Sequence, residues 1–440
     1  LNASDILVGY NLQEFVAADG KLCAALLERE FDAKTIRVLL MDTGFKSVFH
    51  ASADLVLGSG ANLEYENAKG KMVGERLEAG TQLTVGPDSP YLEFGRMIIT
   101  PDEPEAITIR SIERSQGTPV YSGSLEIKGM PEGLVLVNDL YLEDYLTKVV
   151  PSEMPPSYEK EALKAQAVCA RTYAYRQIQG NTYSQYGAHV DDSTNFQVYN
   201  NTSADDRSTQ AVKETYGKML FYEDKPIEAF YFSTSCGRTA DAGVWGTDSG
   251  KYPYLRAAEV KEGGKSLGRE DNDGFESYIK REDVIAYDTS YPMFRWQTDL
   301  PADVASAQIS GAGQIQDMTI TDRGPGGIAG ELTVTGTDGT VTIKGQSSIR
   351  AALGNPSLII TKKDGGTMTG NATLPSAFIA IEKRTGEDGG VFFHIYGGGF
   401  GHGVGMSQNG AQGMAKTGKG YKQILDFFYH GTELRECSES

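Results

Sequence analysis

Residues 140–177 read LYLEDYLTKVVPSEMPPSYEKEALKAQAVCARTYAYRQ and predict two helices with an acid between them. The first helix has a broad apolar face, made by Leu140, Leu142, Tyr145, Leu146 and Val149. We expect Pro151 to end this helix, because proline removes a helical hydrogen bond and crowds the preceding turn. Glu153 then lies on a short connection bounded by prolines.

The second helix is predicted from Tyr158 to Gln179. Ser157 follows two prolines and is a candidate N-cap, and Glu159 and Glu161 suit the positive end of the helix dipole. Its small side chains let neighbours pack closely, so it should be the central buried helix: Ala162, Ala165, Ala167, Ala170 and Ala174.

β-Structure is expected on both sides of this helix pair. Short apolar runs broken by Gly, Asp and Pro fill residues 35–137, and a run of strands with turn signals fills 315–345. Further elements are helices at 205–220 and 347–354, a strand at 227–237, and a closing strand, glycine-rich loop and two helices.

The predicted fold class is α+β: a mixed helical core with the candidate catalytic acid, a β-rich N-terminal region and a β-rich insertion, with a cleft between them. The expected parts are an extension with little pattern at 1–34, the β-rich region at 35–137, the core at 138–264, the insertion at 265–372, and the second part of the core with the glycine-rich loop at 373–435. Residues 35–435 should together form one unit.

The composition excludes some classes of partner. The 440 residues include 41 basic and 59 acidic ones, which gives a net charge of -18. Nucleic acids and anionic membranes bind to clusters of Lys and Arg, so the acidic charge balance argues against both as partners. No apolar run is long enough for a transmembrane helix, and there is no signal peptide. Because the chain begins with Leu1, we expect that a signal or anchor segment precedes it.

The four cysteines are widely separated, with no CxxC pair that would suggest a compact all-cysteine zinc site: Cys23, Cys169, Cys236 and Cys437. Two possibilities remain for these cysteines: they form one or two disulfides, or they are buried free thiols.

Glu153 is the first candidate for chemistry. Prolines restrict the backbone on both sides, and Met154 is apolar. An acid held rigidly in partly apolar surroundings is what a general acid at neutral pH requires. The alternative is an acid that only offsets a helix dipole or is solvated.

The second candidate is the loop GGGFGHGVGMSQNGAQG, residues 397–413. It lacks the GK[ST] ending of a phosphate-binding loop. His402 lies between two glycines, and with Ser407 and Gln408 it could hydrogen-bond a sugar. The alternative for His402 is a loop histidine that is hydrogen-bonded within the protein.

The third candidate is YFSTSCGRTADAGVWG, residues 231–246, whose small hydroxyl residues suit a cleft wall. Ser233 and Ser235 are not surrounded by the G-x-S-x-G elbow of a serine nucleophile. A rival enzyme hypothesis makes Cys236 a thiol nucleophile with His402 as its base.

The fourth candidate is AHVDDSTNFQVY, residues 188–199. His189, Asp191 and Asp192 are ligand-type residues, so a metal site is conceivable. Two of the three are adjacent, which favours a solvated loop.

Several of these segments, in this order, resemble the SpoIID/LytB family (stage II sporulation protein D and relatives). The resemblance rests on LEDYLTKVVPSEMPPSYEKEALKAQAVCARTYA, YFSTSCGRTAD, SSIRAALG and GHGVGMSQNGAQGMAKTGKGYKQILDFFYHGTEL, and it covers about residues 36–434. The first and last of these motifs are long and specific.

This resemblance implies an exported, often membrane-anchored protein that acts on peptidoglycan, associated with the cell wall. The sporulation members of the family are lytic transglycosylases that cleave glycan strands stripped of stem peptides. The family's catalytic acid falls on Glu153, and the segments near it make six residues candidates for substrate binding: Tyr231, Ser233, Ser235, His402, Ser407 and Gln408.

The sequence departs from the resemblance at one place. Some relatives carry a zinc cluster that ends in an HCQ-like triplet, and here the triplet is Asn195-Phe196-Gln197. We therefore expect no metal at this place and no other cofactor.

Two functions from different classes follow. The first is a monomeric transglycosylase whose partner is the glycan strand, with a single carboxylate that acts as acid and then as base. The alternative is a non-catalytic wall-binding protein that recruits or enhances an amidase.

Overall fold

The computed structural model describes residues 6–10, 13–27, 34–387 and 389–436. Its contacts divide the chain into two compact units, residues 1–219 with 435–440, and residues 220–434. The fold class is α+β, as predicted. Near the start of the chain, β1 (Gln13–Ala18) and β2 (Lys21–Leu27) form an antiparallel hairpin.

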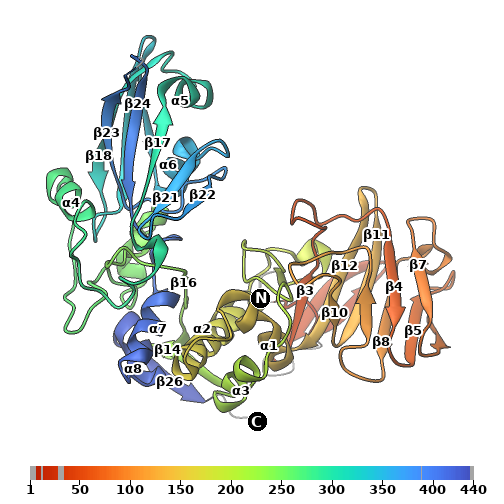
Figure 1. The fold of residues 1–440 in the computed structure, drawn as a ribbon. Helices are drawn as coiled ribbons and strands as arrows, with labels where there is room; N and C mark the ends of the chain where they lie inside the picture. The colour runs from red at the N-terminus through yellow and green to blue at the C-terminus, as the bar shows by residue number, and fades with distance from the viewer. Residues whose placement is uncertain (1–5, 11–12, 28–33, 388, 437–440) are drawn as a thin grey trace. The chain divides into compact units, whose positions relative to one another are not determined.

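The first unit is built on a seven-stranded sheet with the order β13-β3-β12-β11-β8-β5-β6 (Figure 1). Its strands are β3 (Thr35–Leu39), β5 (Ala61–Glu66), β6 (Met72–Leu77), β8 (Arg96–Pro101), β11 (Ser124–Met130), β12 (Gly133–Tyr141) and β13 (Val190–Asp191). Neighbours pair antiparallel except β13, which runs parallel to β3. Residues 134–138 of β12 are all buried, so both faces of the sheet are covered there.

A second sheet of the first unit has the order β10-β9-β4-β7. Its strands are β4 (Ala53–Leu57), β7 (Gln82–Val85), β9 (Ile107–Ile109) and β10 (Val120–Tyr121). The alternation of β4, with Ala53, Leu55 and Leu57 buried, is that of a strand with one face on the core. The β-rich region predicted at 35–137 is thus confirmed.

Three helices of the first unit pack against one another: α1 (Leu142–Glu153), α2 (Lys160–Ile178) and α3 (Asp206–Glu214) (Figure 1). All five alanines predicted to face neighbours on α2 are buried. Arg171 of α2 is 1% exposed and connects α2 to α1. Its guanidinium donates two hydrogen bonds, of 2.6 and 2.7 Å, to the carboxylate of Glu143 on α1. Such a bidentate pair fixes both the distance and the rotation of the two helices.

Two expected helix boundaries are wrong. The first helix does not end at Pro151 but continues through it to Glu153. The second begins at Lys160, and its N-cap is Glu159, not Ser157. Pro151 lies in the last turn of α1, and beyond it Met154 N–H still donates to Val150 O at 2.9 Å, so the turn after the proline is closed.

The second unit contains a five-stranded antiparallel sheet with the order β22-β21-β17-β24-β23. Its strands are β17 (Trp296–Pro301), β21 (Ile359–Lys362), β22 (Thr367–Thr369), β23 (Ile379–Thr385) and β24 (Val391–Gly397). The predicted meander at 315–345 is confirmed as β18 (Ile315–Arg323), β19 (Ala329–Gly336) and β20 (Gly339–Lys344). Two short strands, β16 (Tyr231–Phe232) and β25 (Met406–Ser407), pair in parallel.

The helices of the second unit are α4 (Asn272–Ile279), α5 (Ala302–Gln308), α6 (Gln346–Leu353), α7 (Gln408–Lys416) and α8 (Tyr421–Phe428). The helix predicted to stop at Gly354 and the two closing helices are confirmed. The chain passes between the units through β14 (Lys218–Tyr222), which lies between β15 (Lys225–Pro226) and β26 (Glu433–Glu436).

The strand expected at 227–237 forms only at Tyr231–Phe232. Beyond it the backbone N–H of Ser235 donates to the carboxylate of Asp288 at 2.8 Å instead of to a neighbouring strand. The described residues also form short 3-10 helices: Pro90–Leu92, Ser184–Tyr186, Ala242–Trp245, Ser249–Lys251 and Pro292–Phe294.

Candidate functional site

Glu153 is the last residue of α1 and is partly exposed. A carboxylate at this place opposes the helix dipole, whose negative end is the C-terminus. A position that breaks a local stability rule in this way is a candidate for function.

A loop of the same unit, residues 191–202, holds the end of α1, and we call it the clamp loop. The N–H of Val198 donates to Oε1 of Glu153 at 2.7 Å. The N–H groups of Asn201 and Thr202 both donate to Oγ of Ser152 at 3.1 Å. The Ser152 hydroxyl itself donates to Lys148 O at 2.7 Å. Three backbone donors of one loop therefore bind the last two residues of α1.

The central sheet sets the distance between α1 and the clamp loop. Helix α1 follows directly from β12, and the clamp loop begins within β13. Strand β3 pairs with both, so that Leu39 lies opposite Val137 on one side and Asp191 on the other. The acid and its backbone donor are thus anchored two strands apart on one sheet.

Asp191 organises the first turn of the clamp loop and is fully buried. Its Oδ1 accepts from the N–H and the hydroxyl of Ser193 at 2.9 and 2.7 Å. Its Oδ2 accepts from Tyr183 Oη at 2.8 Å and from Asn195 Nδ2 at 3.0 Å. Four donors satisfy this carboxylate, so it belongs to the framework of the loop.

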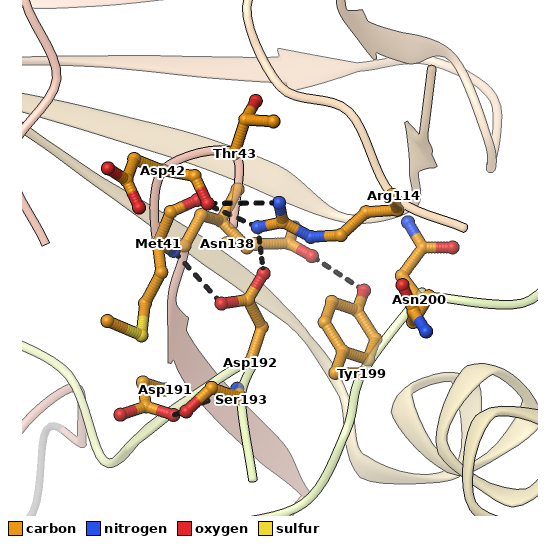
Figure 2. Close-up of polar contacts among 12 residues, drawn as sticks. Met41, Asp42, Thr43, Arg114, Asn138, Asp191, Asp192, Ser193, Tyr199 and Asn200 are labelled. Atoms are coloured by element: carbon orange, nitrogen blue, oxygen red, sulfur yellow. Dashed lines mark hydrogen bonds and ion pairs between the residues drawn. The ribbon is translucent and has the colours of Figure 1, made fainter. Parts of the chain in front are cut away.

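Asp192 joins the clamp loop to the β-rich region through a buried ion pair (Figure 2). Its Oδ2 lies 2.5 Å from Nη2 of Arg114, and both side chains are 0% exposed. Oδ1 accepts from Met41 N–H at 2.9 Å, and Arg114 also donates to Met41 O at 2.7 Å. Burial raises the pKa of Asp192 to about 6, although Arg114 and these hydrogen bonds act in the opposite direction.

The far end of the clamp loop rests on two buried tyrosines. Tyr199 donates to Oδ1 of Asn138 at 2.8 Å (Figure 2) and stacks on Tyr145 with 5.0 Å between ring centroids. Tyr145 donates to Oε1 of Gln197 at 3.2 Å. The pKa of Tyr145 is raised well above its usual value, first by burial and then by the charge of Glu153, so its phenol is neutral.

A left-handed turn at Asn200 (φ 53°) directs the next two N–H groups to Ser152. Asparagine adopts this conformation more readily than most residues. Its side chain is held by a 3.0 Å bond to Val120 O.

His189 is not available as a metal ligand in this structure. Its Nδ1 accepts from Arg37 N–H at 3.0 Å, and Nε2 donates to Val8 O at 2.8 Å. In the described part of the chain, no three His, Cys, Asp or Glu side chains are grouped so that they could hold a metal ion. The bonds of Asp191 and Asp192 show that this stretch is buried, not the solvated loop expected.

The six predicted substrate-binding residues lie in the second unit. Two of them, Ser235 and Ser407, are 0% exposed, and both donate to the buried carboxylate of Asp288, at 3.0 and 2.9 Å. Ser407 is also the N-cap of α7 and accepts from Gly410 N–H at 3.1 Å. Burial raises the pKa of Asp288. This three-residue centre ties segment 233–237 to the glycine-rich loop.

His402 is hydrogen-bonded within the glycine-rich loop region through both ring nitrogens. Nε2 lies 3.0 Å from Tyr231 O, which can only accept, and Nδ1 accepts from Val404 N–H at 3.1 Å. The ring contacts Phe230, Phe232 and Trp245, and burial lowers the pKa of His402 to about 4. His402 is therefore a neutral imidazole with its proton on Nε2.

The thiol hypothesis for Cys236 finds no support in these contacts. Cys236 is 0% exposed, and burial raises its thiol pKa to about 11. His402 has both nitrogens engaged by the backbone, so it cannot serve as the base. Among the described residues, Cys23 and Cys236 carry free thiols and form no disulfide. Cys437 lies outside the described residues.

The remaining candidates are closer to the surface. Tyr231 and Ser233 are partly exposed, and Gln408 is 8% exposed at the start of α7. The loop's glycines mainly permit close packing: Gly405 has φ 77°, and a Cβ there would lie 2.0 Å from Phe230 O. The predicted sugar-binding role of the six residues stays a prediction.

Comparison with known proteins shows where this chain belongs. The stage II sporulation protein (SpoIID) family matches residues 131–222, and a domain of unknown function, DUF8618, matches residues 242–405. Stage II sporulation protein D of Bacillus amyloliquefaciens is 32% identical over 316 residues, which cover 68% of this chain and 76% of that protein. Stage II sporulation protein D of Bacillus subtilis (strain 168) is 32% identical over 341 residues, 72% and 83% of the two chains.

The chain belongs to the SpoIID family.

A further relative of this SpoIID-family chain has a different name. The Amidase enhancer of Bacillus subtilis (strain 168) is 32% identical over 306 residues, which make up 66% of this chain but only 40% of that protein. The part of the chain that matches the SpoIID family contains α1, α2 and the whole clamp loop.

Several residues that shape the site were not predicted. Ser152 is adjacent to Glu153, yet a serine near a helix end has many ordinary uses. Asp288 lies in a stretch that reads as charged and irregular. Arg114 is a lone arginine among short strands. Each acts through a partner more than 45 residues away, and no local pattern encodes such a pairing.

Proposed function

We propose that this SpoIID-family chain cleaves the glycan strands of peptidoglycan by a lytic transglycosylase reaction, with Glu153 as its general acid and base. The observation that carries the proposal is the geometry at the end of α1: a partly exposed carboxylate held at one oxygen by the N–H of Val198 at 2.7 Å. A positioned but accessible carboxylate is what proton transfer to a substrate requires.

The reaction needs one carboxylate in two roles. Protonated Glu153 donates its proton to the glycosidic oxygen, and the bond to C1 of N-acetylmuramic acid breaks. The resulting carboxylate takes the proton of the C6 hydroxyl of the same sugar, whose oxygen then bonds to C1. The product carries a 1,6-anhydro ring, and no water is consumed. The N–H of Val198 stabilises the carboxylate formed between the two steps.

The clamp loop supports a mechanism with a single carboxylate. A glycoside hydrolase normally uses two acids on opposite sides of the scissile bond. The two acids of the clamp loop, Asp191 and Asp192, are fully buried and hydrogen-bonded within the protein. Neither is placed to activate a water or attack a sugar.

The wider role that we propose is in remodelling the cell wall, including sporulation, by a protein that works outside the cytoplasm as a monomer. The names of the stage II sporulation protein D relatives support this role. No helix among the described residues is long and apolar enough to cross a membrane.

The second candidate is a wall-binding protein that enhances an amidase, and the relative named Amidase enhancer favours it. Incubation of the protein with purified strands, with and without stem peptides, separates the two functions by mass spectrometry. A transglycosylase releases fragments with anhydro ends. Fragments one water heavier would mean hydrolysis, and binding without release of soluble fragments would favour the second candidate.

A further inference from the structure

A pocket of about 310 Å³ in the second unit is lined by an excess of positive charge. Its walls come from the end of α4 and the residues after it, and from β17, β21 and β24. Its charged lining residues are five cations and one acid: Lys280, Arg281, Arg295, Lys362, Lys363 and Glu282. The chain as a whole has 59 acidic and 41 basic residues, so its net charge is negative, whereas the charged residues of this pocket have a net positive charge.

Two of the five cations are compensated by carboxylates. Lys280 forms ion pairs with Glu276 and Glu382. Arg281 pairs with Asp283 at 2.9 Å. These two cations therefore add little to the net charge that a ligand would meet.

Arg295 is not compensated in this way. Its Nη1 donates to Cys236 O at 2.8 Å and to Phe294 O at 2.9 Å. Its Nε and Nη2 are buried and have no hydrogen-bond acceptor in the part of the chain that the structure describes. The guanidinium lies over the Phe294 ring, 4.5 Å from its centroid. A guanidinium with two buried nitrogens that lack an acceptor, and with no counter-charge, is unusual and raises the positive potential of its surroundings.

Lys362 and Lys363 lie at the end of β21, and Lys362 pairs in the sheet with Trp296 of β17. Lys363 Nζ donates to Thr289 O at 2.8 Å and lies 5.3 Å from the centroid of Phe294. Neither lysine forms an ion pair with any described residue. With Arg295 they make three uncompensated cations, against the single acid Glu282.

We propose that this pocket binds a phosphate group carried by a larger neutral scaffold such as a polyol or a sugar. Lysine ammonium groups bind phosphate as point charges, and a desolvated arginine behind them strengthens the field. Tyr396, which also lines the pocket and is partly exposed, provides apolar surface for the scaffold. The proposal depends only on this pocket and not on the chemistry of Glu153.

The test is titration calorimetry at low salt with three probes: inorganic phosphate, poly(glycerol phosphate) and poly-glutamate. The wild-type chain should bind poly(glycerol phosphate), and the affinity should fall as salt is added, because screening weakens such contacts. The double variant Lys362→Gln, Lys363→Gln should bind at least about tenfold more weakly, since two of the three uncompensated charges are lost.

The matched control is Lys225→Gln, Lys422→Gln, which removes the same charge from exposed positions of the second unit outside the pocket. It should bind like the wild type. Binding of inorganic phosphate as well would support the site and show that the group is recognised alone. No binding of either phosphate probe, equal loss in both double variants, or tighter binding of poly-glutamate would overturn the proposal.

Because the catalytic acid is not involved, Glu153→Gln should bind poly(glycerol phosphate) like the wild type. A chain that binds this probe but leaves glycan strands intact would therefore refute the proposed reaction and not the pocket. A chain that cleaves strands but binds neither phosphate probe would refute the phosphate pocket and not the proposed reaction.

Discussion

The backbone N–H of Val198 lies 2.7 Å from Oε1 of Glu153, although the two residues are 45 positions apart in the chain. The bond connects the end of a helix with a loop that starts on the same sheet. It gives one carboxylate a defined orientation at a place where the helix dipole disfavours its charge. Substitutions of Glu153 and of its neighbour Ser152 test this arrangement.

Glu153→Gln should abolish strand cleavage. Glutamine keeps the size of the side chain and can still accept from Val198 N–H, but it cannot transfer a proton. We expect a loss of about 10²–10⁴-fold or more in kcat, as for other general acids. The release of anhydro-ended fragments, followed by mass spectrometry, measures it. Glu159→Gln, at the exposed N-cap residue of α2, is the control and should keep full activity. Full activity of Glu153→Gln would refute the assignment.

Ser152→Ala should show that the clamp loop positions the acid. The substitution removes the acceptor of the Asn201 and Thr202 N–H groups, and we expect a loss of about 1–3 kcal/mol in the free energy of unfolding. It should also lower kcat with little change in KM, because the substrate-binding surface is kept. Ser152→Thr, which retains the hydroxyl, should restore part of kcat.

The control for this prediction is Ser157→Ala. Ser157 is exposed and is not the N-cap of α2, so its loss should change the stability by less than about 0.5 kcal/mol. If both alanine variants lose stability equally, or if Ser152→Ala keeps its full kcat, the clamp loop has no special role.

The sequence predicts the elements of this protein better than their connections. The apolar face of α1 and the alanines of α2 follow from helical periodicity, which is a local property. Glu153 could be named because its surroundings match a family motif. The end of α1 could not be predicted, because a proline usually marks the end of a helix. Here the helix continues for two residues beyond Pro151.

The partners of the site residues could not be predicted, since they depend on which strands become neighbours. Ser235 is predicted to bind a sugar because its segment has small hydroxyl residues that suit a cleft wall, and Ser407 because it is a polar residue of the glycine-rich loop. In the structure both bind Asp288, and only the fold brings those three segments together. Residue type alone does not separate a hydroxyl that binds ligand from one that satisfies a buried acid.

Arg114→Met should destabilise the first unit. The substitution leaves the carboxylate of Asp192 buried without its ionic partner, and breaking a buried pair from one side typically costs about 3–5 kcal/mol. The pKa of Asp192, already raised to about 6, should rise further, so that protonation relieves the penalty in acid. The loss should therefore be larger at pH 7.5 than at pH 5.

Urea unfolding followed by far-UV circular dichroism at the two pH values measures this difference. Arg110→Met, at an exposed position in the same unit, is the control and should change the stability by less than about 0.5 kcal/mol. An equal loss for Arg114→Met at both pH values would contradict the role of the Asp192 charge.

Removal of metal ions should not change strand cleavage. The clamp loop contains the Asn195-Phe196-Gln197 triplet, the place where the family resemblance would put zinc ligands, and four donors to Asp191 hold its first turn. Activity is compared before and after prolonged dialysis against a chelator. A loss that zinc restores would show that a metal contributes to the site after all.

The second unit should lose stability as the pH falls from about 6.5 to 4, because His402 must accept a proton in the unfolded chain but resists it in the folded one. Its folded pKa is about 4 against an ordinary value of 6.5, so its contribution is complete above pH 6.5 and is lost as the pH falls to about 4. A difference of this size corresponds to about 3 kcal/mol. Protonation of Nδ1 would remove the acceptor of Val404 N–H.

His402→Gln tests this directly, because glutamine offers a donor and an acceptor but does not titrate. Both tryptophans of the chain, Trp245 and Trp296, lie in the second unit, so their fluorescence during urea unfolding follows that unit. The variant should be less stable than the wild type at pH 7, and the difference should shrink as the pH approaches 4. Parallel curves for the two proteins would show that His402 is not the group whose protonation weakens the fold.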